Sequence, residues 1–269
     1  METRQPHTSP TELMEKEARM AAAKSTTTSA RRRVTTAPQH PEDSLFGEDE
    51  HASMRRLLLA ALDTFAQLGY HGTATRDIAR RAQVSAGGLY SHYESKQALL
   101  ERISRAAHEG SLARMREAKD EGGTPTECLA RIISTHVRFH AEYNTACRVA
   151  NYELHSLTPE NLKEMRKLRQ GMEQVVADVL LEGTKTGEFV IQDRPLVTMF
   201  ILSLGIDVSR WFRPGHRLTP SDLASQYQGL VLQALKAPGA PGAAAGAGAQ
   251  NGKPGKTSKP RKTSLATGR

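Results

Sequence analysis

The chain has 269 residues, of which 38% are hydrophobic, so it is long enough for one or two domains with a sizeable core. No stretch approaches the roughly 20 consecutive apolar residues that a membrane span needs, and the opening METRQPHTSP lacks the apolar region of a signal peptide. We therefore expect a cytoplasmic protein that does not enter a membrane. Cys128 and Cys147 are the only cysteines, too few for a disulfide framework, so both are expected to be reduced and packed.

The formal net charge of +8 is concentrated in two regions. Residues 51–105 carry 8 basic and 4 acidic side chains, and residues 236–269 carry 7 basic side chains and no acidic one. The remaining parts of the chain are close to neutral. Two separate basic regions are the distribution expected of a protein that meets phosphate groups.

The predicted elements begin after an extension. Residues 1–48 mix Thr, Ser, Pro, Ala and charges without sustained periodicity, which predicts disorder. Beyond them apolar residues recur three and four positions apart, and no alternation typical of strands persists, so we expect an all-α protein. A first helix ends at Gly69. Two short helices follow, TRDIARRA and AGGLYSHY, the second capped by Ser85, and Ser95 caps a long fourth helix.

Five more helices are expected downstream, the first in PTECLARIISTHVRFHAEY and the second in the residues that follow it. TPEN is a strong start signal for the third, since Thr158 can cap it and Pro159 suits the first helical position, and Gly187 ends it. Asp193 begins the fourth and Thr219 the fifth. The final segment, APGAPGAAAGAGAQNGKPGKTSKPRKTSLATGR, is rich in Pro, Gly, Ala and Lys and cannot build a core, so we expect a disordered basic tail.

Two short helices joined by a tight turn form a helix-turn-helix unit, whose second helix can enter the major groove of DNA. The small Ala79 lets the two helices approach closely, and Ile78, Val84 and Leu89 would fill the seam between them. The face of the second helix that stays free carries Gly87, Gly88, Ser91 and His92.

The segment GYHGTATRDIARRAQVSAGGLYSHYESKQALL resembles the DNA-binding domain of the TetR family of transcriptional regulators, over about residues 52–102. The matching elements are Gly69-Tyr70, Asp77-Ile78-Ala79, Val84-Ser85, Leu89-Tyr90-x-His92-Tyr93 and Ser95-Lys96. The resemblance implies an all-α fold in which an N-terminal three-helix helix-turn-helix domain is joined to a helical ligand-binding and dimerisation domain. The expected divisions are the extension (1–48), the DNA-binding domain (49–100), the ligand-binding and dimerisation domain (101–236) and the basic tail (237–269).

The resemblance also implies roles for residues of this unit. Tyr90, Lys96 and Thr75 would contact backbone phosphates, whereas Arg76, Ser91 and His92 are candidates for base edges. The whole set expected to contact DNA is Thr75, Arg76, Ser85, Gly87, Gly88, Tyr90, Ser91, His92 and Lys96. Packing is the alternative interpretation for Tyr90, His92 and Tyr93, and a solvated face is the alternative for Arg80 and Arg81.

The sequence departs from the family pattern in two places. Gly87 and Gly88 stand at the start of the recognition helix, and each glycine costs about 0.5–1 kcal/mol of helix stability. Ala74 stands where a Ser or Thr usually caps the preceding helix. Either Thr73 or Thr75 replaces that cap, or a contribution of about 0.5–2 kcal/mol is missing.

The last two helices suggest a homodimer. LVTMFILSLGIDVSRWF is too apolar for a surface helix of a monomer, and with LASQYQGLVLQAL it could pack against a second copy as a four-helix bundle. The alternative is that both helices complete a monomeric core. A dimer is also the usual means by which a helix-turn-helix protein reads two half-sites of a palindromic operator.

Residues 125–212 are expected to enclose a pocket for a small-molecule inducer, although each lining residue could equally belong to the core. The expected lining is Phe139, Tyr143, Cys147, Asn151, Leu154, Met172, Val175, Val176 and Trp211. The segments NYELHSLTPENLKEMRKLRQGMEQVV and SRWFRPGHRLTPSDLASQY are similar to TetR-type regulators that respond to acyl-coenzyme A thioesters and control fatty-acid or steroid breakdown. That narrower resemblance implies an acyl-CoA whose phosphates lie near Arg148, Arg166, Arg169 or Arg213, where surface ion pairing is the alternative.

The sequence predicts no enzyme and no cofactor, because it has no Gly-rich phosphate loop, nucleophile elbow or metal-ligand spacing. His136 and His140 lie four residues apart and could bind a metal, but packing or pocket lining is favoured since no HExxH motif accompanies them. The expected function is a repressor that an inducer releases from DNA. The rival is an architectural DNA-binding protein that depends on the basic tail, which could instead only solubilise the chain.

Overall fold

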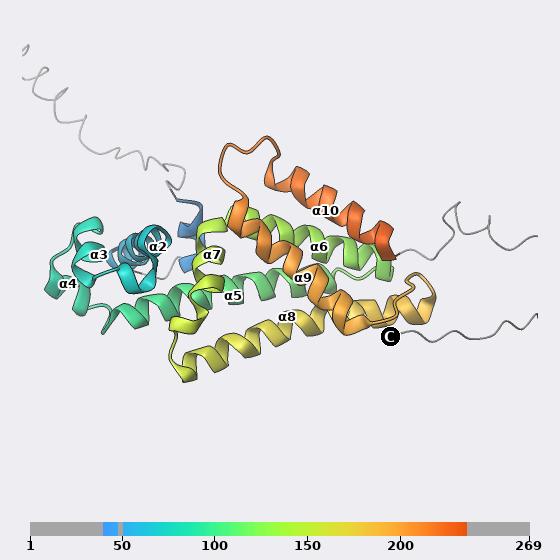
Figure 1. Ribbon diagram of the computed structural model, residues 1–269, viewed down its shortest axis with the longest axis horizontal. Helices are drawn as coiled ribbons and strands as arrows, with labels where there is room; N and C mark the ends of the chain where they lie inside the picture. The colour runs from blue at the N-terminus through green and yellow to red at the C-terminus, as the bar shows by residue number, and fades with distance from the viewer. Residues whose placement is uncertain (1–39, 48–50, 236–269) are drawn as a thin grey trace, which may run out of the picture. The chain divides into compact units, whose positions relative to one another are not determined.

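The computed structural model describes residues 40–47 and 51–235, and every regular element within them is helical (Figure 1). The predicted basic tail and the extension up to residue 39 lie outside the described residues. No helix of the described part is both long and apolar enough to cross a membrane. The elements are η1 (Pro41–Phe46), α2 (Ala52–Gly72), α3 (Thr75–Arg81), α4 (Ala86–Tyr90), α5 (Lys96–Asp120), α6 (Pro125–Glu142), α7 (Asn144–Tyr152), η2 (Leu154–Ser156), α8 (Pro159–Thr186), α9 (Arg194–Trp211) and α10 (Pro220–Leu235).

Two apolar cores share the long helix α5. The first core gathers α2, α3 and α4 around the start of α5, and α7 and the start of α8 join it. The second core is made by the later part of α5 together with α6, α8, α9 and α10. Figure 1 shows α5 running from the helices α2–α4 into the helical domain, where α6 and α8 lie along it. Helices α5 and α8 therefore belong to both packing units, and α5 alone begins among the DNA-reading helices.

Local signals fix most of the helix ends. Thr158 Oγ1 accepts a hydrogen bond from the backbone N–H of Asn161, and Pro159 follows it, as the sequence predicts. Gly187 ends α8 with φ at 79°, a left-handed conformation that favours glycine. Ser95 and Asp193 cap α5 and α9 in the same way as Thr158 caps α8. These predicted boundaries are confirmed.

The predicted disorder of residues 1–48 is wrong for its last part. Residues Pro41–Phe46 form η1, in which Phe46 is 1% exposed within the first core. The buried carboxylate of Glu42 accepts a hydrogen bond from the backbone N–H of Thr145 at 3.1 Å, at the start of α7. The chain therefore begins to pack before the DNA-binding domain predicted from residue 49.

Two details of the helix-turn-helix unit differ from expectation. Helix α4 contains only residues 86–90, whereas the pattern AGGLYSHY predicts a helix to Tyr93. Two glycines lower its helix propensity, and its end is a turn in which the N–H of Ser91 bonds to the carbonyl of Gly87. Ala74 occupies the N-cap of α3 and no side chain replaces the missing cap. Of the two alternatives for this position, the absent cap is the one observed.

Candidate DNA-binding surface and ligand cavity

Helices α3 and α4 meet in a close seam. Ile78 and Leu89 are fully buried there, and Ala79 is 3% exposed, so its small side chain permits the approach. The turn between the helices is tight because Gln83 adopts a φ of 57° and the N–H of Val84 returns to the carbonyl of Ala79. The outer face of α4 is left free to meet another molecule.

Tyr90 and Thr75 lie together on that outer surface. Their hydroxyl oxygens are 3.2 Å apart, one from α4 and one from the start of α3. Tyr90 is 52% exposed, so packing does not account for its ring. Two adjacent hydroxyls on a basic domain can donate to one phosphate and fix how α3 and α4 lie on a duplex.

Lys96 forms structural hydrogen bonds in addition to its expected phosphate contact. Its ammonium donates to the carbonyls of Tyr70 at 2.7 Å and Thr73 at 2.8 Å, and it lies 4.2 Å from the centre of the Tyr70 ring. These bonds join the first turn of α5 to the corner between α2 and α3. One N–H of the ammonium is left for a phosphate.

The two serines that flank α4 form hydrogen bonds with backbone groups of that helix. Ser85 Oγ accepts from the N–H of Gly88, and Ser91 Oγ donates to the carbonyl of Gly88. A methyl group added at Gly88 would lie 3.2 Å from Ser85 Oγ, whereas one added at Gly87 would meet only the same oxygen, at 4.0 Å. Position 87 therefore has more room for a side chain than position 88.

His92 and Arg76 stand in different environments. His92 follows α4 rather than lying on it, and its Nε2 is 2.8 Å from Ser53 Oγ, which is also 2.8 Å from His51 Nδ1. These two hydrogen bonds connect the end of α4 to the start of α2, so His92 has a structural contact in addition to its expected contact with DNA. Arg76 is exposed on α3. Arg81, by contrast, binds the Asp63 carboxylate through two nitrogens.

A second site lies in the helical domain, where a cavity of about 80 Å³ is enclosed by α5, α6, α7, α8 and α9. Its outer part is formed by exposed Glu173 and Met199 and half-buried Arg169. Its lining is Ala107, His108, Ser111, His136, His140, Cys147, Ala150, Asn151, Arg169, Met172, Glu173, Met199, Leu202, Ser203 and Ile206.

Three of these residues are buried histidines. Burial lowers the pKa of His108 and of His136 to about 4, against an ordinary value of 6.5, and lowers the pKa of His140 well below that value. The rings of His136 and His140 lie edge to face, with centres 4.4 Å apart. No group of three metal-ligating side chains suited to a metal ion occurs within residues 40–47 and 51–235. The arrangement is that of neutral hydrogen-bonding groups.

The structure brings only part of the expected lining to this cavity. Cys147, Asn151 and Met172 line it, and burial raises the pKa of the Cys147 thiol, which keeps that group neutral. The residues outside it are Phe139, Tyr143, Leu154, Val175, Val176 and Trp211. Phe139 instead packs against Tyr143 and the Arg114 guanidinium, and Trp211 is 36% exposed beside His216.

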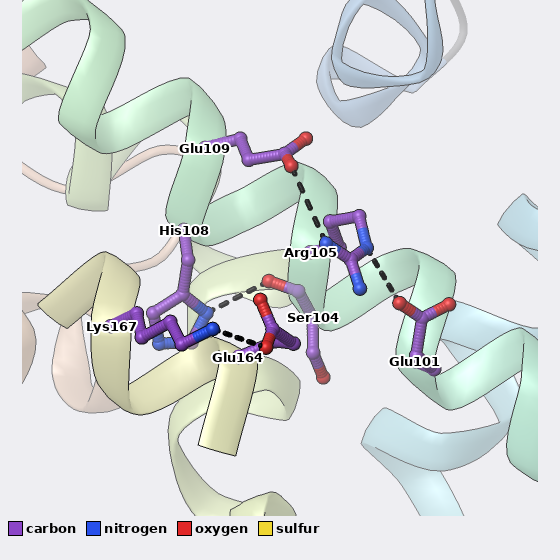
Figure 2. A network of polar contacts seen from close by, with 7 residues as sticks. All are labelled: Glu101, Ser104, Arg105, His108, Glu109, Glu164 and Lys167. Atoms are coloured by element: carbon purple, nitrogen blue, oxygen red, sulfur yellow. Dashed lines mark hydrogen bonds and ion pairs between the residues drawn. The ribbon is translucent and has the colours of Figure 1, made fainter. Parts of the chain in front are cut away.

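Sequence reasoning missed the contribution of α5. His108 and Ser111 are 3% exposed on the α5 face that meets the other helices, one turn apart along the cavity wall. Polar residues spaced three apart on the apolar side of a long helix are the signal that could have found them. Figure 2 shows His108 on the same helix as Arg105, which instead pairs with Glu101 and Glu109 on the surface.

These features define a helix-turn-helix DNA-binding protein with a helical domain that contains a cavity. Comparison with known proteins agrees with that class. Residues 57–103 match the family described as bacterial regulatory proteins of the tetR family, and residues 122–235 match the tetracyclin repressor-like C-terminal domain. The chain belongs to the TetR family of transcriptional regulators, which are DNA-binding proteins and not enzymes.

Similar proteins include the HTH-type transcriptional repressor KstR2 of Mycobacterium tuberculosis, 30% identical over 192 residues that cover 68% of this chain and 92% of the relative. A solved tetR-family regulatory protein from Rhodococcus RHA1 is 33% identical, with a TM-score of 0.66 over 70% of this chain and 98% of the other. FadR of Bacillus subtilis, solved with stearoyl-CoA, shares the fold at 24% identity and a TM-score of 0.55, over 67% of this chain and 98% of its own.

Proposed function

We propose that the protein is a dimeric repressor that binds a palindromic operator and leaves it when a small molecule fills the cavity. The observation that carries the proposal is the course of α5. Its first residue, Lys96, is bonded to the corner before α3, while His108 and Ser111 of the same helix line the cavity. A ligand that shifts α5 therefore acts on the DNA-reading unit without touching it.

The proposed DNA-contacting set is Thr75, Arg76, Ser85, Gly87, Gly88, Tyr90, Ser91, His92 and Lys96. Tyr90 and Thr75 are its anchor, because their hydroxyls meet on an exposed face. Arg76 is the candidate for a base edge, since its guanidinium is exposed and can form two parallel hydrogen bonds to guanine. The other residues shape the surface and position the backbone.

The proposed dimer uses α9 and α10. Both helices leave large apolar side chains exposed although each also packs on the second core. Burying such residues in a second copy removes apolar surface from water and favours association. The exposed residues are Leu196 (64%), Met199 (63%), Phe200 (49%) and Leu230 (67%).

An acyl-CoA thioester is the proposed inducer class. FadR, which shares the fold, was solved with stearoyl-CoA, and this chain has Arg169 beside a cavity whose wall combines Ala, Met, Leu and Ile side chains with polar ones. About 80 Å³ holds only part of such a molecule, so the bulky nucleotide would stay outside, on the Glu173 side of the cavity. Arg169, which makes no ion pair within the described residues, would then meet an anionic group.

The test is a selection of bound fragments from random duplex DNA, repeated with and without acyl-CoA. We expect one palindrome to be enriched, and the enrichment to be lost with the thioester. The same selection with residues 237–269 deleted should recover the same palindrome. Loss of nearly all binding in the truncated protein would instead favour the architectural alternative, in which the basic tail supplies the affinity.

A further inference from the structure

Each of the three histidines around the cavity uses one ring nitrogen on a backbone carbonyl. His108 Nδ1 is 2.8 Å from the carbonyl oxygen of Ser104 (Figure 2), and His140 Nδ1 is 2.9 Å from that of His136. His136 Nε2 is 3.1 Å from the carbonyl oxygen of Leu202 on α9. Because a carbonyl oxygen only accepts hydrogen bonds, each of these nitrogens must carry a proton.

The other nitrogen of each ring is therefore an acceptor. Burial keeps all three rings neutral near pH 7, so each ring carries one proton and no more. His136 Nδ1 is buried without a hydrogen-bond partner. His108 Nε2 and His140 Nε2 likewise have no donor among the described residues. The cavity wall thus holds three imidazole lone pairs that nothing in the described protein satisfies.

Asn151 adds a fourth acceptor. Its Nδ2 donates to the carbonyl of Cys147 at 2.7 Å, which leaves the amide oxygen for the cavity. Among the lining residues, the uncommitted donors are the buried hydroxyl of Ser111, the hydroxyl of Ser203 and the guanidinium of Arg169. Of the four acceptors, His136 Nδ1 is buried and unpaired, and a buried acceptor is costly to leave without a donor.

We propose that the cavity is built for a largely apolar ligand that carries at least one hydroxyl group, whose O–H donates to this acceptor cluster of His108, His136, His140 and Asn151. The inference rests on the proposed function, which makes the cavity the effector site, and it adds the chemistry of the effector. A ketone or an ether has no proton to donate and leaves the cluster unpaired. An anionic group on the same molecule would be placed at Arg169.

The experiment compares three small probes on the full-length protein at pH 8. Phenol and toluene have equal numbers of non-hydrogen atoms, and anisole replaces the hydroxyl by a methyl ether. We expect phenol to bind at least tenfold more tightly than either analogue by calorimetry. In protein labelled with ¹⁵N at histidine, phenol alone should shift the resonances of the unprotonated ring nitrogens of the cluster.

His140→Leu is the decisive variant, because leucine fills much of the same space and has no acceptor to replace Nε2. The preference for phenol over anisole should fall to less than threefold. His155→Leu is the matched control, since His155 is exposed and outside the cavity lining, and it should keep the full preference.

Three results would overturn the inference. The first is equal binding of phenol, anisole and toluene. The second, measured on the wild-type protein, is that the histidine ¹⁵N resonances do not shift when phenol binds. The third is stoichiometric zinc binding that displaces phenol, which would make the imidazoles metal ligands. Operator binding measured on the same preparation separates the two proposals. Retained thioester-sensitive DNA binding without a phenol preference refutes only the hydroxyl ligand, whereas a phenol preference without operator binding refutes only the repressor.

Discussion

Acidification from pH 8 to pH 5 should destabilise the folded protein through His108 and His136. Well above pH 6.5 both rings are neutral in the folded and the unfolded chain, so they add no pH dependence there. Below pH 6.5 the two histidines of the unfolded chain become protonated. In the folded protein the same rings stay neutral until the pH approaches their pKa of about 4. Stability therefore falls as the pH falls through the window from 6.5 to 4.

The magnitude follows from the two pKa values. At pH 5 the unfolded rings lie 1.5 pH units below their pKa, which is worth about 2 kcal/mol for each histidine, or about 4 kcal/mol for the pair. That is a large part of the roughly 5–15 kcal/mol that stabilises a typical domain. His140, whose pKa is lowered in the same direction by burial, should steepen the loss.

The assay is urea unfolding followed by circular dichroism at pH 8, 7, 6 and 5, at one protein concentration. The wild-type protein should lose stability progressively below pH 7. His108→Asn should remove about 2 kcal/mol of the difference between pH 8 and pH 5, whatever its stability at pH 8. A wild-type free energy of unfolding that stays constant from pH 8 to pH 5 would refute the assignment of neutral buried rings.

Four further variants test other parts of the structure. Gly205→Ala would place a methyl group 2.1 Å from His136 Cδ2, so urea unfolding should show a loss of about 1–3 kcal/mol. Gly87→Ala, whose methyl group meets only Ser85 Oγ at 4.0 Å, should instead gain about 0.5–1 kcal/mol, and equal effects of the two would contradict the close packing. Arg76→Ala should weaken operator binding by about 1–3 kcal/mol in a fluorescence anisotropy titration while changing binding to scrambled DNA much less; an equal loss on both would make Arg76 a phosphate contact. Phe200→Glu should give a monomer in sedimentation velocity, and an unchanged dimer would place the interface elsewhere.

The fold was predictable where short-range signals decide it. Thr158, Pro159 and Gly187 specify both ends of α8 through contacts within a few residues, and the structure follows them. Element η1 escaped prediction because its stability comes from far along the chain. Its Glu42 carboxylate meets Thr145, and neighbouring residues give no hint of that contact. The length of α4 was only partly predictable. Its two glycines indicate a low helix propensity, but they do not indicate at which residue the helix ends.

The two candidate sites also differ in how far the sequence could predict them. Thr75 and Tyr90 are 15 residues apart on adjacent helices, so the motif alone could assign both to one phosphate-contacting group, and the structure brings their hydroxyls together. The cavity needs five helices, and its lining depends on the rotation of each about its axis. Phe139 was expected to line it, but His136 and His140, on the same helix, do so instead. A shift of one residue turns a side chain by about 100°, which is enough to exchange cavity for core.

Two hydrogen bonds fix the end of α2 next to α3, and each comes from a helix, or from the residue just after a helix, that also lines the cavity. Gly69 has a φ of 71° at a kink within α2, three residues before that helix ends, and the next N–H, of Tyr70, donates to the Glu153 carboxylate at 3.1 Å, just after α7. Lys96 of α5 binds the carbonyl of the same Tyr70. The opposite face of α7 contributes Cys147 and other residues to the cavity wall, as α5 does. We therefore expect a ligand to act on α3 and α4 through two helices at once, and a hundredfold preference for the DNA-free arrangement would shift operator binding by about 2.7 kcal/mol.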